Sequence, residues 1–284
     1  MESVNIPTLD AELFCRVECL VGEGPFWHDH HLYWVDIFQS RLYTCDERGV
    51  GLRFLTLPSH VGAAAPYGRG FIAGTKDGIG LLTSEGSFSL LPSSPRLPAE
   101  VRFNDGKLDP AGRFWCGTTT YEVTPKAGAL YRVERDGEVK CVLEGLTIAN
   151  GLDWDKEAGL FYYIDTPTQR VDVFDYDAAS GAIEHRRVAF EIPKELGLPD
   201  GMTRDSIGRL WIACWGAGQV VGFDPHTGQS VGRIRVPTQL PSSCWIGPDG
   251  RTLYITTARS VLSPEALACE PLAGSVFRAE LPGL

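Results

Sequence analysis

One plan of strands and turns recurs six times along this chain. Each copy has a strand-like start, a polar turn containing Gly or Asp, an apolar aromatic strand, and a second strand that ends near another Gly. Three copies place an Asn or Asp at the same point, and Asn104, Asn150 and Asp200 are separated by 46 and 50 residues. A period of about 40–50 residues is typical of four-stranded propeller blades. The repeat therefore predicts an all-β fold, a six-bladed β-propeller that residues 1–284 form as a single domain.

The residue types within the copies favour strands over helices. The runs RFWCGT, LFYYID, RLWIAC and TLYITT are rich in aromatic and β-branched residues, and no long helical period continues between the Gly and Pro positions. A ring of blades must be closed, because an open sheet edge would otherwise remain. The run ELFCRVECLV precedes the first copy. We therefore expect residues near 11–20 to pair with the C-terminal strand near 275–281, so that both chain ends complete one blade.

Composition and charge limit the classes of binding partner that this chain could have. The net charge of −10 argues against nucleic acid, which needs a clustered basic surface, and makes a cation the better guest. No run of about 18 apolar residues is present, and the start MESVNIPTLDAELF has neither the basic nor the apolar region of a signal peptide. We expect a cytoplasmic monomer that binds neither nucleic acid nor membranes, with its eight scattered cysteines reduced and in the core.

The Asn-Gly and Asp-Gly pairs at the start of three copies have two interpretations. Such pairs are the commonest two-residue hairpin turns. The following stretches LDPAGRF, WDKEAGLF and RDSIGRL already supply the hairpin, however, so Asn104, Asn150 and Asp200 fall at the start of the first strand of a blade. That strand lines the central channel of a propeller, and Glu23 takes the same place in the first copy. Two carboxylates and two carboxamides would then converge, a set of hard oxygen ligands suited to calcium, magnesium or manganese.

Several separated motifs resemble one known family. The stretches GEGPFW, RFNDGKLDPAGRFWCGT, NGLDWD and PDGMTRD, followed by GRLWIACWG, are similar to the senescence-marker protein/gluconolactonase family of regucalcin-like sugar lactonases. The resemblance covers nearly the whole chain, through LYITTAR and PLAGSVF near the C-terminus. It implies a six-bladed propeller with one catalytic divalent metal ion at its centre, which could be Ca, Mg, Mn or Zn.

The resemblance also implies roles for six residues. It assigns the metal ligands to Glu23, Asn150 and Asp200. Arg102 and Asn104 match positions that contact substrate, and they lie two apart, so in a strand both side chains leave the same face. Glu122, in TTTYEV, matches a substrate-side acid only by its distance from RFNDGK, in a loop that departs from the family's pattern.

The expected activity is hydrolysis of a small-molecule sugar lactone, an aldonolactone, to the sugar acid, with water activated at the metal and Asp200 as general base. Two alternatives remain open: a calcium-binding propeller without turnover, and a phosphotriester or fluorophosphate hydrolase. Convergence of a base, metal ligands and Arg102 in one cavity favours catalysis.

Overall fold

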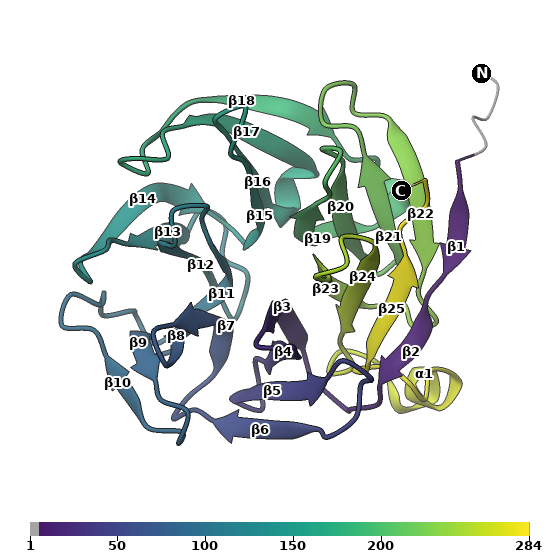
Figure 1. The fold of residues 1–284 in the computed structure, drawn as a ribbon, viewed down its shortest axis with the longest axis horizontal. Coiled ribbons are helices and arrows are strands. Elements are labelled where there is room, and N and C mark those ends of the chain that lie inside the picture. Colours follow the sequence, from purple (N-terminus) through teal and green to yellow (C-terminus); the bar gives the residue numbers. More distant parts are fainter. Residues whose placement is uncertain (1–5, 284) are drawn as a thin grey trace.

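Six four-stranded blades surround a central channel in the computed structural model, which describes residues 6–283 (Figure 1). Within the first five blades the four strands follow one another in chain order from the channel outwards, and in the sixth the outermost strand comes from the N-terminal segment. The first strands of neighbouring blades contact each other round the ring. This arrangement confirms the predicted six-bladed propeller, and it lines the channel with the first strand of every blade.

The first blade contains β3 (Gly22–His28), β4 (His31–Asp36), β5 (Arg41–Asp46) and β6 (Arg53–Thr56). The second contains β7 (Val61–Tyr67), β8 (Gly70–Thr75), β9 (Gly78–Leu82) and β10 (Phe88–Leu90). The third contains β11 (Val101–Leu108), β12 (Phe114–Thr120), β13 (Gly128–Val133) and β14 (Val139–Leu146). The fourth contains β15 (Ala149–Asp155), β16 (Leu160–Asp165), β17 (Arg170–Tyr176) and β18 (Ile183–Glu191). The fifth contains β19 (Leu198–Arg204), β20 (Leu210–Trp215), β21 (Gln219–Phe223) and β22 (Ser230–Arg235). The sixth contains β23 (Pro241–Ile246), β24 (Thr252–Thr257), β25 (Val276–Glu280) and β2 (Glu12–Cys15). The helical elements are short: η1 (Thr166–Thr168), η2 (Lys194–Leu196) and α1 (Pro264–Cys269). None of the helices in residues 6–283 has the length and apolar character needed to cross a membrane.

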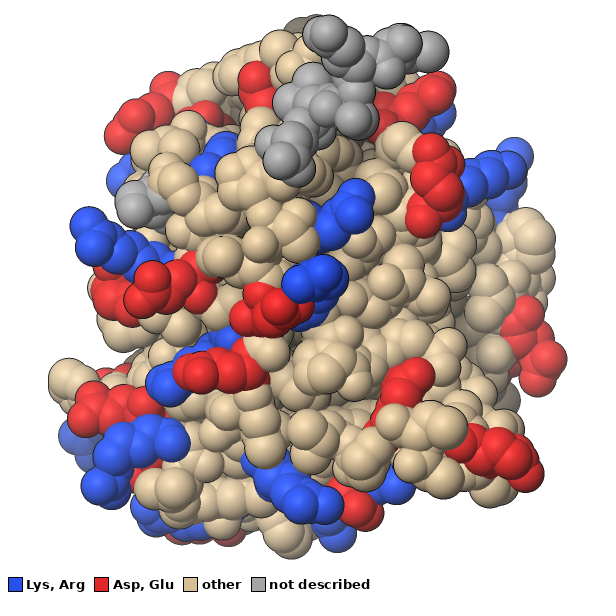
Figure 2. Space-filling model, turned by 90° about the vertical axis from the view of Figure 1, so that its right-hand side faces the viewer, with Lys and Arg blue, Asp and Glu red and all other residues tan. Residues whose placement is uncertain are grey.

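The N-terminal segment closes the ring as predicted. Strand β2 pairs antiparallel with β25, with Glu12 opposite Arg278. One feature was not predicted: the preceding strand β1 (Thr8–Asp10) pairs parallel with β22 at the outer edge of the fifth blade. Figure 2 views this side of the molecule, where acidic and basic side chains lie interspersed. The N-terminal segment therefore joins the fifth and sixth blades and covers an edge of each.

The hairpin after the first strand of a blade explains a recurring pattern, Asp-x-x-Gly-Arg-x-Trp. In the third blade, Asp109 accepts hydrogen bonds from Arg113 Nε (2.7 Å) and Trp115 Nε1 (3.0 Å). The fifth blade repeats this network with Asp205, Arg209 and Trp211. The carboxylate thus holds the turn and the buried indole together, and the tryptophans fill the core between blades.

A β-bulge interrupts the first strand of every blade at the same level. Bulges bend a strand and redirect its side chains. At three of these bulges, glycine allows the next first strand to approach closely: a Cβ on Gly62, Gly151 or Gly201 would lie within 2.7 Å of the neighbouring backbone. The Asn-Gly and Asp-Gly pairs are therefore not hairpin turns, because they form the bulges that face the channel.

The cysteine prediction is correct for most of the positions. All eight cysteines are free. Six are buried, whereas Cys141 and Cys269 are exposed, so the expectation of core thiols is wrong for these two. Cys141 lies on the outermost strand of its blade and Cys269 ends α1, and neither element is covered by another layer.

Candidate functional site

The bulges bring four predicted residues to one place. Glu23, Asn104, Asn150 and Asp200 lie on β3, β11, β15 and β19, and all four side chains are buried. Together with Arg102 they line a cavity of about 290 Å³, which we call the front cavity, at the end of the channel where the first strands begin. The structure thus places five of the six predicted site residues around a shared space.

Glu122 is the exception. It falls in the turn after β12, where it is exposed, and it does not line the front cavity. Its neighbour Val123 lines the cavity instead, with a left-handed backbone (φ 53°). The family position carried to Glu122 by distance alone is therefore not reproduced in the geometry of this loop.

An aromatic wall surrounds the Arg102 guanidinium, and sequence reasoning did not find it. The rings of Phe38 and Tyr121 lie 5.5 and 5.9 Å from Arg102 Cζ. Tyr121 Oη forms a hydrogen bond of 2.7 Å with His60 Nδ1, and the His60 ring meets the Phe38 ring edge to face. These residues come from three different blades, so no spacing along the sequence indicates that they meet.

Hydrogen bonds link the site across three blades. Arg102 Nη1 donates to Asn104 Oδ1 (2.6 Å), and Asn104 Nδ2 donates to both Asn150 Oδ1 (2.7 Å) and Ala149 O (3.0 Å). Asn150 Nδ2 donates to Thr166 Oγ1 (2.8 Å), which itself donates to the carbonyl of residue 199. Thr166, a missed site residue, thereby fixes which end of the Asn150 amide faces the cavity. Both amide hydrogens of Asn104 are in use, so its part in binding substrate stays a prediction.

The two acids of the site lack enough hydrogen-bond donors. Glu23 accepts one backbone hydrogen bond, from Gly24 N (2.9 Å), and Asp200 Oδ1 is buried without a partner among residues 6–283. Burial raises the pKa of Glu23 well above its usual range, and the nearby carboxylates of Asp200 and Asp105 raise it further. Burial, followed by the charge of Asp105, also raises the pKa of Asp200. The chain thus buries acids that it does not itself neutralise.

This donor set fits a divalent cation. Glu23 and Asp200 offer carboxylate oxygens and Asn150 offers an amide oxygen, the ligands that calcium, magnesium and manganese prefer. A cation between them would also satisfy the orphaned Asp200 oxygen and offset the repulsion between the acids. No group of three or more His, Cys, Asp or Glu in residues 6–283 is placed to hold a metal, as expected if the third ligand is an amide.

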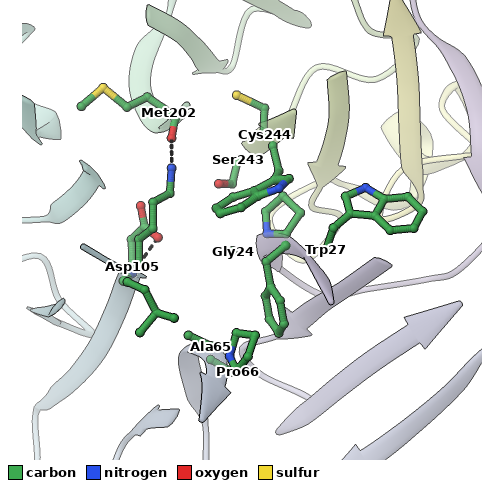
Figure 3. A pocket seen from close by; sticks show the side chains of 15 residues that line it. Gly24, Trp27, Ala65, Pro66, Asp105, Met202, Ser243 and Cys244 are labelled. Atoms are coloured by element: carbon green, nitrogen blue, oxygen red, sulfur yellow. Dashed lines mark hydrogen bonds between the residues drawn. The ribbon is translucent and has the colours of Figure 1, made fainter. Parts of the chain in front are cut away.

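A smaller cavity of about 150 Å³, the rear cavity, lies farther along the same strands, beyond the bulges (Figure 3). Lys107 extends into it and donates to Asp153 Oδ2 (2.7 Å) and to the Met202 carbonyl (3.0 Å). Its ammonium also lies 4.8 Å from the centre of a Trp245 ring. The rear cavity therefore contains a cation that belongs to the chain.

Comparison with known proteins agrees with the fold. The family described as SMP-30/Gluconolactonase/LRE-like region matches residues 21–259. The chain belongs to this family. A putative sugar lactone lactonase, YvrE, of Bacillus subtilis is 38% identical over 278 residues, which cover 96% of this chain and 95% of the relative. Human regucalcin is 36% identical over 271 residues, covering 92% and 90%.

Solved structures of family members share the architecture. A calcium-binding protein, regucalcin, from Agrobacterium tumefaciens superposes with a TM-score of 0.90 at 25% identity, covering 98% of this chain and 96% of that one. A gluconolactonase from Xanthomonas campestris has a TM-score of 0.75 at 22% identity, covering 99% and 93%, and supports the fold alone. The predicted family is thus confirmed over nearly the whole chain.

Proposed function

We propose that this protein is a divalent-metal-dependent hydrolase that opens sugar lactones, the aldonolactones, to the corresponding sugar acids. Its relatives include proteins named as lactonases. The observation that carries the proposal is the buried Asp200 Oδ1, which faces other oxygen donors and has no protein partner in residues 6–283. A purely structural carboxylate would be satisfied by the chain, as Asp109 is.

Glu23, Asn150 and Asp200 would hold the metal, which when bound supplies stabilisation of the negative charge that develops on the lactone carbonyl oxygen. Asp200 is the proposed general base: its unpartnered oxygen can accept a proton from the attacking water. As the ring C–O bond breaks, the leaving oxygen takes a proton and becomes the hydroxyl of the sugar acid. Arg102 donates to substrate from the wall of the cavity.

Removal of the metal tests this function. The purified protein, treated with a chelator, should hydrolyse no lactone and keep its circular dichroism spectrum. Calcium, magnesium, manganese or zinc, added one at a time, should restore hydrolysis of five- or six-membered aldonolactones.

Two other results would replace the proposal. Tight calcium binding without hydrolysis of any lactone would favour a calcium-binding propeller without turnover; the Agrobacterium relative is named as a calcium-binding protein. Hydrolysis of a phosphotriester or fluorophosphate but of no lactone would favour the phosphotriesterase alternative. The cytoplasmic location and the monomeric state also stay proposals, and size-exclusion chromatography checks the second.

A further inference from the structure

The donors of Arg102 are only partly used. Its Nη1 donates to Phe103 O (3.1 Å) and to Asn104 Oδ1 (2.6 Å), which accounts for both hydrogens on that nitrogen. Its Nε is buried without a partner, and Nη2 makes no hydrogen bond to the described residues. Because the Nε and Nη2 hydrogens lie parallel on one edge of the planar guanidinium, Arg102 keeps a free two-donor edge.

The charge of Arg102 is unbalanced as well. No carboxylate within residues 6–283 forms an ion pair with it, and it is the one cationic side chain among the described residues that line the front cavity. The carboxylates whose charge acts on Arg102, Glu23 and Asp200, are the proposed metal ligands. The rings of Phe38 and Tyr121 hold the guanidinium plane in place. A partly buried, oriented cation without an anion is costly unless a ligand supplies one.

The rest of the wall offers little to a substrate whose groups are all hydroxyls. A hydroxyl both donates and accepts, so a polyol needs acceptors as well as donors. The amide of Asn104 and the hydroxyl of Thr166 are already committed within the chain. Away from the acids, the lining is largely apolar, with Val123, Leu198 and Val261 exposed at the rim. Ser260 and Trp215 add neutral polar groups to this wall, but its one free charged element is the donor pair of Arg102, which matches an anion better than a hydroxyl.

We propose that the substrate is a sugar lactone that carries a second, carboxylate group, an aldaric acid monolactone, and that Arg102 binds this carboxylate through Nε and Nη2. The inference rests on the proposed lactonase function. Water adds to the lactone carbonyl, the ring C–O bond breaks, and the product is a dicarboxylate with its new carboxylate on the side of Glu23, Asn150 and Asp200. A single guanidinium edge fits the two oxygens of a carboxylate, whereas a phosphate dianion calls for further cations that this cavity lacks among its described residues.

The test compares two lactones of the same ring size and configuration, one ending in a carboxylate and the other in a hydroxymethyl group. For the metal-loaded protein, kcat/KM should be about 10- to 100-fold higher for the carboxylate-bearing lactone, mainly through KM, as expected for hydrogen bonds between charged groups. Arg102→Met should remove this preference, and Arg102→Lys should keep part of it because the charge remains without the fork. Arg251→Met, at an exposed turn outside both cavities, should keep it in full.

Each other result has a distinct meaning. Equal or better hydrolysis of the hydroxymethyl lactone by the wild type overturns the carboxylate proposal and leaves the lactonase function standing, even if Arg102→Met does not fold. Preference for a phosphorylated lactone overturns the assignment to a carboxylate. If no lactone is hydrolysed, the proposed function fails. In that case, calorimetric titration with an aldarate and with the matching aldonate tests the role of Arg102 separately from hydrolysis. Equal affinities for the two ligands overturn the proposal that Arg102 binds a carboxylate.

Discussion

The front and rear cavities lie on either side of the same ring of bulges, yet their charges are balanced differently. In the rear cavity Lys107 meets the Asp153 carboxylate, the Met202 carbonyl and a Trp245 ring. In the front cavity Glu23 and Asp200 crowd together, and one oxygen of Asp200 has no partner in residues 6–283. A buried charge that the chain satisfies holds the fold together, whereas one that it leaves unsatisfied marks a place for a ligand.

The largest effect is expected from removing a charge of the front cavity. Asp200→Asn should weaken metal binding and lower kcat by more than about 10²–10⁴-fold, since it removes both a ligand and the base. The unfolding midpoint of the chelated variant should not fall, because the change relieves repulsion between buried acids. Calorimetric titration with calcium and manganese, with steady-state kinetics, measures the first two effects.

Glu23→Gln is the companion variant, because it removes a ligand but leaves the base. It should weaken metal binding and, at saturating metal, lose less rate than Asp200→Asn. Unchanged metal affinity in both variants would contradict the assignment of these acids as ligands.

Removing a charge from the rear cavity should lower stability, in contrast to the front cavity. Lys107→Met leaves the largely buried Asp153 carboxylate without its cation, and losing one partner of a buried pair costs about 3–5 kcal/mol of unfolding free energy. Denaturant unfolding measures this loss.

Lys140→Met is a matched control, since Lys140 is half exposed and solvent screens its ion pair with Glu138, so losing that pair should change the unfolding free energy little. Similar losses in the two lysine variants would mean that the rear cation does not stabilise the ring, and the contrast between the cavities would disappear.

Much of this arrangement could be predicted because it repeats. The 46- and 50-residue spacings of Asn104, Asn150 and Asp200 located the first strands, and every first strand of a propeller faces the channel. The role of Lys107 could not be predicted from the NDGK motif, because its partners come from the fourth, fifth and sixth blades. Local pattern indicates which strand lines a channel, but it does not indicate which side chains meet across it.

The position of Glu122 outside the front cavity has a related cause. Glu122 was carried over by distance along a loop, and loop conformation is set by local backbone geometry that the repeat does not encode. The left-handed backbone at Val123 directs that residue to the cavity and leaves Glu122 exposed. The parallel pairing of β1 was missed for another reason: three exposed residues have no apolar alternation that would mark a strand.

The dependence of stability on pH offers a smaller test of how the two cavities differ in their buried charges. Asp105 lines the rear cavity, and burial raises its pKa to about 6, although Lys107 and the Gly106 amide partly offset the shift. Because the folded state favours the protonated form, this contribution to stability is complete below about pH 4 and is lost as pH rises through about 6. In the chelated protein, Asp105→Asn should therefore be more stable than the wild type by up to about 3 kcal/mol at pH 8, and by much less at pH 4.

Unfolding by denaturant at both pH values measures that difference. Asp136→Asn, at an exposed turn, serves as the control and should show no such change with pH. A difference between wild type and Asp105→Asn that does not vary with pH would show that folding leaves the pKa of Asp105 unchanged, and would contradict the burial cost assigned to this carboxylate.

The smallest effect separates two neighbouring residues, Tyr121 and Glu122, in the turn after β12. Tyr121→Phe keeps the ring beside Arg102 but removes the hydroxyl bonded to His60 (2.7 Å), so the wall loses one neutral hydrogen bond. Such a bond contributes about 0.5–1.5 kcal/mol, and KM for the favoured lactone should rise by about 2- to 10-fold with kcat little changed. Glu122→Ala should leave both constants within about twofold, because an exposed side chain outside the cavity contributes little. A larger loss in Glu122→Ala than in Tyr121→Phe would mean that the loop turns inward when substrate binds, and would return the acid to the role that the family resemblance assigns to it.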